Sequence, residues 1–252
     1  MSSTLDHSLS MLVRKLASIG PLSESEQHAV LNLPAVVRSL PARHEILREG
    51  DVPSQCCLVL DGWVSRYKQL KDGRRQIFSF HVPGDMPDLQ SLHVPVMDHG
   101  LCTLTQASLA FIPHQSLRKL TVRFPGLAAA LWRETLIDGG IFRAWMLGLG
   151  HRSAFEHMAH LFCELYLKLE AVGLAQDYRY SFPIMQTDLG DALGLTNVHA
   201  NRTLQVLRRK ELITLQRGSL VINDWPALVR AAGFDPAYLS LEDPQSRGWN
   251  PQ

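Results

Sequence analysis

The stretch DLGDALGLTNVHANRTLQVLRRKELI, residues 188–213, contains two short helical patterns separated by a glycine. In the first pattern, apolar residues recur at i, i+3 and i+4 from Leu189, which is the spacing of one helix face. Gly194 ends this pattern, because glycine readily adopts the left-handed conformation that closes a helix. Thr196 is placed to cap the next helix by accepting a backbone N–H bond. The segment therefore predicts two helices joined by a tight turn.

The second predicted helix has two unlike faces. The inward stripe is formed by Ala200, Thr203, Leu204 and Leu207. The opposite face carries Asn197, Val198, Asn201, Arg202 and Gln205. A solvated helix usually mixes Glu and Lys, whereas amide and guanidinium groups match the edges of adenine and guanine in the major groove. The pattern favours DNA binding, with a plain surface helix as the alternative.

The charge of the chain is local rather than global. Its 252 residues are 46% hydrophobic and 19% charged, with a formal net charge of only +1, as in a globular protein with a core. This length allows two domains of ordinary size. Between Arg202 and Arg217, five basic residues meet one acid, Glu211. Such an excess supports the DNA-binding motif, although it also occurs on solvated helix faces.

The sequence contains no targeting signal that we recognise. No apolar run approaches the roughly 18 residues needed to span a membrane. The N-terminal residues MSSTLDHSLSMLVRKLASIG lack the basic start and apolar core of a signal peptide. The cysteines, Cys56, Cys57, Cys102 and Cys163, show no framework spacing and no CxxC pair. We therefore expect a reduced, cytoplasmic protein without a membrane partner.

Residues 39–113 differ from the rest of the chain in their pattern of apolar and turn-forming residues. Short apolar runs alternate there with turn signals, among them Asp61-Gly62 and Asp72-Gly73. Strands of similar length separated by such turns predict a sandwich or barrel, here a jelly roll of the cupin-like type. Helical spacing precedes this region from Leu9 to Leu33. The expected fold is α+β, with an N-terminal jelly-roll β-domain over residues 1–125.

A long helix is predicted over residues 126–150, in GLAAALWRETLIDGGIFRAWMLGLG. At 1.5 Å per residue, the part from about Leu127 to Leu149 would span roughly 34 Å. Its apolar stripe contains Ile137, Ile141, Ala144 and Gly148, and the small residues at 139, 140, 144 and 148 would let a partner backbone approach closely. We therefore expect a dimerisation helix and a homodimer, with packing on the chain's own β-domain as the alternative.

A winged helix-turn-helix is predicted over residues 151–239. After the opening motif, LITLQRGSLVIND reads as two short strands around Arg217-Gly218, and Asp224 caps a last helix. In EHMAH, His157 and His160 lie three apart, but they lack the HExxH pattern of a zinc site, and we take them for helix-surface histidines. Residues 240–252 are polar and are expected to form a disordered tail.

A β-roll, a long helix and a C-terminal winged helix-turn-helix, in that order, resemble the CRP/FNR family of bacterial transcription regulators. The most specific segments are REGD, LVLDGWV, HVPGD and TDLGDALGLTNVHANRTLQVLRRKELI, and the resemblance covers about residues 9–234. The chain looks most like the branch with a VHxNR recognition helix. The resemblance implies a cyclic-nucleotide-binding-like sensor domain and a homodimer that binds double-stranded DNA at an inverted repeat. It also implies RNA polymerase as a partner.

The resemblance assigns roles to the recognition helix. Arg202 matches the arginine that reads a guanine in each half-site, and Asn197, Val198 and Asn201 match the neighbouring base-facing positions. Many relatives have a glutamate where this chain has Val198, so the DNA site should differ from the common family sequence. Phosphate contacts are expected from Gln186, Thr187, His199, Arg208 and Arg209. For His199 the alternative is a solvent-facing side chain without a role.

The β-domain departs from the nucleotide-binding members of the family. Those members bind ribose with a Gly-Glu pair and phosphate with an Arg-Ser pair. Here Asp88 lies near the position of that glutamate, and His99-Gly100 stand where Arg-Ser would be. The loss of a bidentate arginine leads us to expect no cAMP binding. Asp88, His99, Gly100 and Cys102 remain candidates for the pocket of an unidentified effector, acting through haem or a thiol switch. For Cys102 the alternative is a buried, inert thiol.

No cofactor is evident from the sequence. The N-terminal cysteine cluster that holds an iron–sulfur group in oxygen-sensing relatives is absent, because no cysteine precedes Cys56. The alternative function is a cupin-like metal-dependent enzyme, with ligands drawn from His81, His93, His99 and His114. Cupin ligands need histidines at tight alternate spacing, and no HxH occurs here. We therefore expect a regulator rather than an enzyme, and no metal site.

Overall fold

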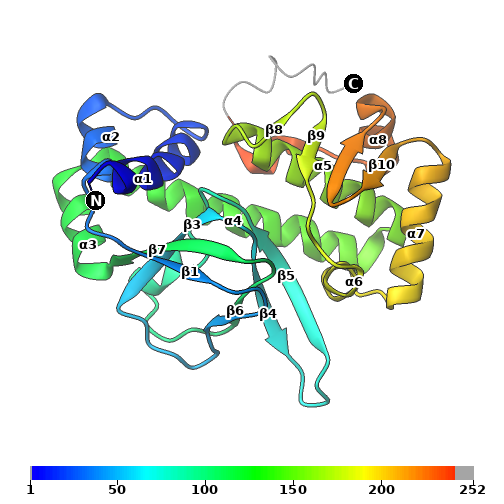
Figure 1. Cartoon of the computed structure of the whole chain (residues 1–252), viewed down its shortest axis with the longest axis horizontal. Helices are drawn as coiled ribbons and strands as arrows, with labels where there is room; N and C mark the ends of the chain where they lie inside the picture. The colour runs from blue at the N-terminus through cyan, green and yellow to red at the C-terminus, as the bar shows by residue number, and fades with distance from the viewer. Residues whose placement is uncertain (1, 242–252) are drawn as a thin grey trace.

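The computed structural model describes residues 2–241. Figure 1 shows a β-roll below a long central helix, with two helices above its N-terminal end and a winged helix-turn-helix around its C-terminal end. The predicted α+β fold, with an N-terminal jelly-roll domain and a C-terminal winged helix-turn-helix, is confirmed.

The β-roll is built from two antiparallel sheets. One has the strand order β1-β7-β3 and the other β2-β6-β4-β5. The strands are β1 Val36–Leu40, β2 Glu45–Leu47, β3 Gln55–Asp61, β4 Val64–Gln69, β5 Arg75–His81, β6 Gly100–Thr103 and β7 Ala107–Pro113. Gly62 and Gly73 close the two predicted turns with φ of 82° and 84°, a region that favours glycine. A short 3₁₀ helix, η1 (Leu89–Leu92), follows β5.

Helices flank the β-roll in the chain. The predicted N-terminal helices are α1 (Ser2–Ala17) and α2 (Glu24–Leu31), and α2 begins with a capping box between Ser23 and Glu26. After β7 a further helix, α3 (His114–Arg123), closes the domain. No element was predicted for residues 114–123; α3 is short and lacks a side-chain cap.

The long helix α4 runs from Pro125 to His151 and has two apolar faces. One face packs within the chain, where Ile137, Ile141 and Trp145 are buried. The other face is exposed and includes Trp132, Leu136, Phe142, Met146, Leu147 and Leu149. The stripe predicted to meet a partner, which includes Ile137 and Ile141, is therefore the one that packs inside the chain.

The small residues of α4 are also used within the chain. A Cβ on Gly140 would lie 3.2 Å from the carbonyl oxygen of Tyr238, and one on Gly148 would lie 2.5 Å from the ring of His157. The prediction that these glycines admit a partner backbone is wrong for both positions, because Tyr238 and His157 of the same chain already occupy the space.

The C-terminal domain begins with α5 (Ala154–Ala171). It continues through β8 Ala175–Gln176, β9 Arg179–Ser181, α6 Gln186–Leu193, α7 Asn197–Arg209, β10 Ile213–Gln216, β11 Ser219–Ile222, α8 Trp225–Ala232 and η2 Pro236–Leu239. The predicted wing is the β10–β11 hairpin, which turns at Arg217 and Gly218 with positive φ at both. Asp224 caps α8, since its Oδ1 accepts from the Ala227 N–H at 2.9 Å.

Two histidines of α5 correct an expectation. His157 and His160 are buried, not on the helix surface. His160 lies 5.0 Å from the ring of Phe234 and stacks on Tyr238 at 5.9 Å. Burial lowers the pKa of His160 to about 3, so the ring is neutral inside the domain. These histidines are core residues of the C-terminal domain.

A continuous apolar core joins the domains. Trp63 and Phe80 of the β-roll contact Phe182 and Trp145, at centroid distances of 6.2 and 5.6 Å. The described cysteines are all buried and free, and burial raises the pKa of the Cys56 thiol. None of the helices in residues 2–241 has both the length and the apolar character to cross a membrane. Beyond Leu241 the predicted tail lies outside the described residues.

Candidate nucleic-acid interface

The turn between α6 and α7 is set by two glycines and a threonine. Gly194 ends α6 with φ 66°, in the left-handed region. A Cβ on Gly190 would lie 2.7 Å from the carbonyl oxygen of Leu195, so this helix position also requires glycine. Thr196 caps α7, because its Oγ1 accepts from the His199 N–H at 3.2 Å. The predicted helix-turn-helix is formed as the sequence indicated.

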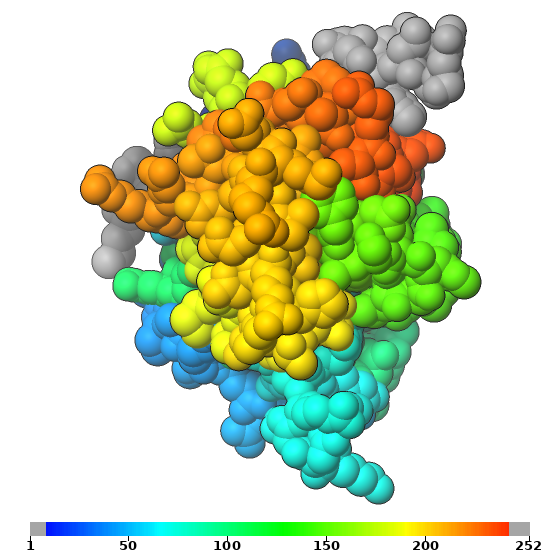
Figure 2. All heavy atoms as spheres, turned by 90° about the vertical axis from the view of Figure 1, so that its right-hand side faces the viewer, coloured from blue at the N-terminus to red at the C-terminus, as the bar shows by residue number. Residues whose placement is uncertain are grey.

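The two predicted faces of α7 are present. Ala200, Thr203, Leu204 and Leu207 are buried. The exposed residues are Asn197, Val198, His199, Asn201, Arg202 and Gln205. Figure 2 shows this end of the molecule face on, with α7 in yellow-orange crossing its middle and no described segment of the chain in front of it. The predicted base-reading residues therefore share one free surface.

The expected phosphate-contacting residues frame this surface. Gln186 and Thr187 open α6, Arg208 and Arg209 close α7, and all are exposed. Beside α7 a shallow hollow is lined by Ser153 and Phe155 on one side and Val198 and Arg202 on the other. Arg202 thus lies at an open surface with room around its side chain.

A residue that the sequence analysis left without a role, Asp188, joins α6 to the β-roll. Its carboxylate oxygens lie 2.5 and 2.6 Å from Nη1 and Nη2 of Arg43, which precedes β2. Arg75 of β5 lies 2.7 Å from Asp188 Oδ1 and, through Nε, 2.9 Å from Asp191. The Asp188 side chain is only 1% exposed. We call these four residues the Arg–Asp clamp; it fixes the helix-turn-helix on its own β-roll.

Comparison with known proteins agrees with this arrangement. The family model for the cyclic nucleotide-binding domain matches residues 37–123, and that for the Crp-like helix-turn-helix domain matches residues 156–231. The nitrogen fixation regulation protein FixK of Bradyrhizobium diazoefficiens is 30% identical over 188 residues, covering 74% of this chain and 77% of that protein. The chain belongs to the CRP/FNR family of DNA-binding transcription regulators.

Two further relatives support the assignment to the CRP/FNR family. The nitrogen fixation regulation protein FixK of Rhizobium meliloti is 28% identical over 207 residues, covering 79% of this chain and 90% of that protein. The solved structure of FixK2 from Bradyrhizobium japonicum has a TM-score of 0.72 at 28% identity, and the match covers 79% of this chain and 98% of that one.

The alternative of a cupin-like enzyme finds no support in these relatives, which are named as regulators. Three of the four histidines considered as metal ligands have other side-chain partners: His81 bonds to Ser79 at 2.8 Å, His114 to Ser91 at 3.0 Å and His99 to Asp98 at 2.6 Å. Across residues 2–241, no group of three or more His, Cys, Asp or Glu residues is placed to hold a metal ion.

In this CRP/FNR regulator Asp88 is buried beneath β3. Its Oδ1 accepts a hydrogen bond from the backbone N–H of Cys57 at 2.8 Å. Burial raises the pKa of Asp88 to about 7, more than hydrogen bonding lowers it. The carboxyl group is therefore engaged in holding the β-roll together, at the position where the resemblance places a ribose-binding glutamate.

The other candidate effector residues lie on and around β6. His99 Nδ1 lies 2.6 Å from Asp98 Oδ1, and its ring packs edge-on against Phe78 at 5.7 Å. A Cβ on Gly100 would lie 2.6 Å from Cζ of Tyr67. Cys102 is buried, and burial raises the pKa of its thiol. Aromatic rings thus fill the space beside His99 and Gly100.

Replacement of Asp88 with asparagine is expected to stabilise the protein in a pH-dependent way. The amide oxygen still accepts from Cys57, but the buried ionisable group is gone. Because the pKa of Asp88 is higher in the folded than in the unfolded state, protonation of Asp88 favours the folded wild type. This contribution is fully present below about pH 4 and is lost as the pH rises through about 7. The variant should match wild type near pH 4 and exceed it by up to about 4 kcal/mol above pH 7. Urea unfolding across this range measures the difference, and a pH-independent difference would contradict the assignment.

Proposed function

We propose that this protein is a homodimeric regulator that binds an inverted-repeat DNA site through the exposed face of α7 in each subunit. Arg202 reads one guanine in each half-site, and Asn197, Val198 and Asn201 contact the neighbouring bases. Gln186, Thr187, His199, Arg208 and Arg209 contact phosphates and set the register of the protein on the duplex. RNA polymerase is the partner on which the bound dimer acts, and the cytoplasm is its compartment.

The observation that carries this proposal is the free, polar and basic face of α7 at one end of the molecule (Figure 2). The face is rigid, because the opposite side of α7 is buried and its first turn is capped by Thr196. Amide and guanidinium side chains on a preformed helix can enter the major groove without ordering of the backbone, which limits the entropy lost on binding.

The exposed apolar face of α4 supports the homodimer. Trp132 is 70% exposed, Leu136 57% and Met146 60%, on a helix of 27 residues. Their separations of four and ten residues place them on one side of the helix, opposite the buried one. Two copies of this stripe would cover each other, and the two α7 helices would then lie about 34–36 Å apart on one face of the duplex.

Control by cAMP is not part of this proposal. The position that should bind phosphate holds His99 and Gly100 rather than arginine and serine, and Tyr67 and Phe78 pack against them. Asp88, at the expected ribose contact, accepts from the Cys57 backbone. A cyclic phosphate would find no guanidinium among these residues.

Binding of a genomic inverted repeat tests the function. We expect slow migration of a fragment that carries two half-sites, and an affinity that falls steeply with salt as phosphate contacts release counterions. Arg202→Ala should lower the affinity, whereas Lys119→Ala, which removes one exposed charge on α3 far from α7, should not. Equal losses in both variants would show that α7 does not carry recognition.

A further inference from the structure

We propose that the protein binds a small zwitterionic molecule of the α-amino acid class in a polar cavity where α1, the β-roll, α4 and α5 meet. Binding itself does not depend on the proposed function; only its effect on DNA binding does.

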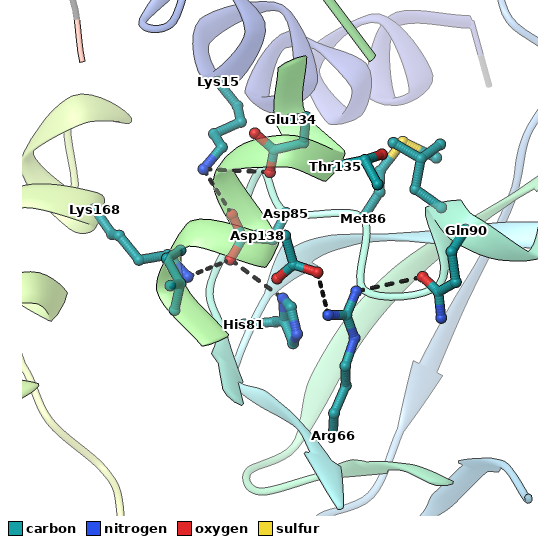
Figure 3. A pocket seen from close by; sticks show the side chains of 12 residues that line it. Lys15, Arg66, His81, Asp85, Met86, Gln90, Glu134, Thr135, Asp138 and Lys168 are labelled. Carbon is teal, nitrogen blue, oxygen red and sulfur yellow. Dashed lines mark hydrogen bonds and ion pairs between the residues drawn. The ribbon is translucent and has the colours of Figure 1, made fainter. Parts of the chain in front are cut away.

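The cavity has a volume of about 160 Å³ and draws its lining from separate parts of the chain (Figure 3). Its polar lining comprises Lys15 of α1, Arg66, His81, Asp85 and Gln90 of the β-roll, Glu134, Thr135 and Asp138 of α4, and Lys168 of α5. Its apolar lining comprises Met86, Leu89 and Ile141. Thr135 is exposed and Asp138 is only partly buried, so the cavity opens to solvent along α4.

Asp85 is the central anion of the cavity. Its carboxylate lies 3.1 Å from Nζ of Lys15 and 2.9 Å from Nζ of Lys168. The same carboxylate accepts from the Val82 N–H at 3.1 Å, and together these contacts use its oxygens. The two lysines hold the pKa of Asp85 well below its usual range. Asp85 is therefore ionised and satisfied without a ligand.

Glu134, in contrast, has an unused acceptor. Its Oε1 lies 3.4 Å from Lys15, but Oε2 is buried and has no hydrogen-bond partner among the described residues. A buried carboxylate oxygen without a partner is unfavourable, and native proteins satisfy nearly all such atoms. Burial raises the pKa of Glu134 in this state. A ligand with an ammonium group would supply the missing donor.

The cavity also has unused donors. An ammonium group has three N–H donors. Lys15 has partners in Asp85 and Glu134, and Lys168 has partners in Asp85 and the Phe80 carbonyl oxygen. Among the described residues this leaves one donor of each ammonium group without a partner. These donors would accommodate a carboxylate.

Arg66 offers further donors on the β-roll side. It bonds to the Pro87 carbonyl oxygen through Nε and pairs with Asp138 through Nη1. Its Nη2 has only a long contact, 3.4 Å, to Gln90 Oε1. Figure 3 shows Arg66 approaching from a different side than the two lysines.

Charge balance and size define the ligand class. Lys15, Arg66 and Lys168 face Asp85, Glu134 and Asp138, and burial of a ligand with net charge would leave a charge uncompensated. A net-neutral molecule that carries both an ammonium and a carboxylate group matches the unused acceptor and donors. A cavity of about 150 Å³ accepts benzene, so roughly six non-hydrogen atoms fit. Alanine has this size, and Ile141 and Met86 offer contacts for its methyl group.

The site differs from the cyclic nucleotide position of the family. None of Asp88, His99, Gly100 and Cys102, the residues that the resemblance places there, lines the cavity. The lining includes α1 and α5 instead. Because Glu134 belongs to α4 and Lys168 to the first helix of the DNA-binding domain, a ligand that contacts both would favour one angle between these helices.

Isothermal titration of the full-length protein with alanine tests the proposal. Propionate, which lacks the ammonium group, and ethylamine, which lacks the carboxylate, are the singly charged probes. We expect saturable binding of alanine alone. The variant Glu134→Gln should bind alanine at least tenfold more weakly, whereas Lys119→Ala should bind it like wild type. Unfolding curves of each variant establish that the fold is retained. If Glu134→Gln does not fold, Ile141→Phe takes its place; its larger side chain fills the cavity and should abolish binding.

Three outcomes would overturn the inference. The first is no saturable binding up to about 10 mM alanine, since six well-placed atoms can give much tighter binding than that. The second is binding of propionate or ethylamine as tight as that of alanine. The third is unchanged binding of alanine by Glu134→Gln. The proposed function is tested separately, by DNA binding in the absence of alanine; it would fail if the protein did not bind DNA there, whatever the result with alanine.

Discussion

Replacement of Asp188 with alanine is expected to lower the free energy of unfolding by about 3 kcal/mol. The carboxylate is buried and faces both arginines of the Arg–Asp clamp, Arg43 and Arg75. Removing it leaves two guanidinium groups close together without their shared anion. The arginine side chains are 35% and 23% exposed, so water can solvate them in part, which places the loss at the lower end of the range for broken buried pairs.

Urea unfolding of Asp188→Ala and of Asp191→Ala measures this effect. Asp191 is 32% exposed and shares only Arg75, so its replacement should cost no more than about 1 kcal/mol. Arg43→Ala combined with Asp188→Ala should lose less than the sum of the two single losses, because both remove the same interaction. Additive losses would show that the clamp does not stabilise the domain contact.

Replacement of Leu136 with aspartate is expected to dissociate the dimer and weaken binding to an inverted repeat at least 100-fold. The side chain is 57% exposed in the single chain and belongs to the exposed apolar stripe of α4. A carboxylate there would be buried without a partner when two helices pair. Each subunit would then bind its half-site alone and lose the gain from linked binding, about 10²–10⁴.

Sedimentation gives the oligomeric state of Leu136→Asp, and fluorescence anisotropy gives its DNA affinity. Val122→Asp is the matched control, because Val122 is 84% exposed on α3 and lies off the stripe. Monomers that bind an inverted repeat as tightly as wild type would refute the role of α4 in recognition.

The parts that the sequence predicted correctly rest on local patterns. The faces of α7 follow from a 3.6-residue period over thirteen residues, and the turn follows from Gly194 and Thr196. The β-roll and the wing follow from turn signals such as Arg217-Gly218, which constrain only their neighbours. These features need no knowledge of distant residues.

The parts that the sequence analysis missed rest on contacts between distant residues. Asp188 meets Arg43 and Arg75 from more than a hundred positions away, and no local pattern indicates this. His157 and His160 look like surface residues until α4 and η2 cover both sides of α5. The face of α4 that would meet a partner was misassigned for the same reason. Both sides of this helix carry apolar residues, and the sequence does not indicate which side packs on the β-roll.

The most direct test of the account measures how Arg202 couples to one base pair. Wild type and Arg202→Ala are titrated with a duplex that carries the footprinted inverted repeat, and with duplexes in which one base pair per half-site is changed in turn. We expect wild type to discriminate at one guanine by about 1–3 kcal/mol, and Arg202→Ala to lose discrimination at that position only. Unchanged discrimination at every position would contradict it.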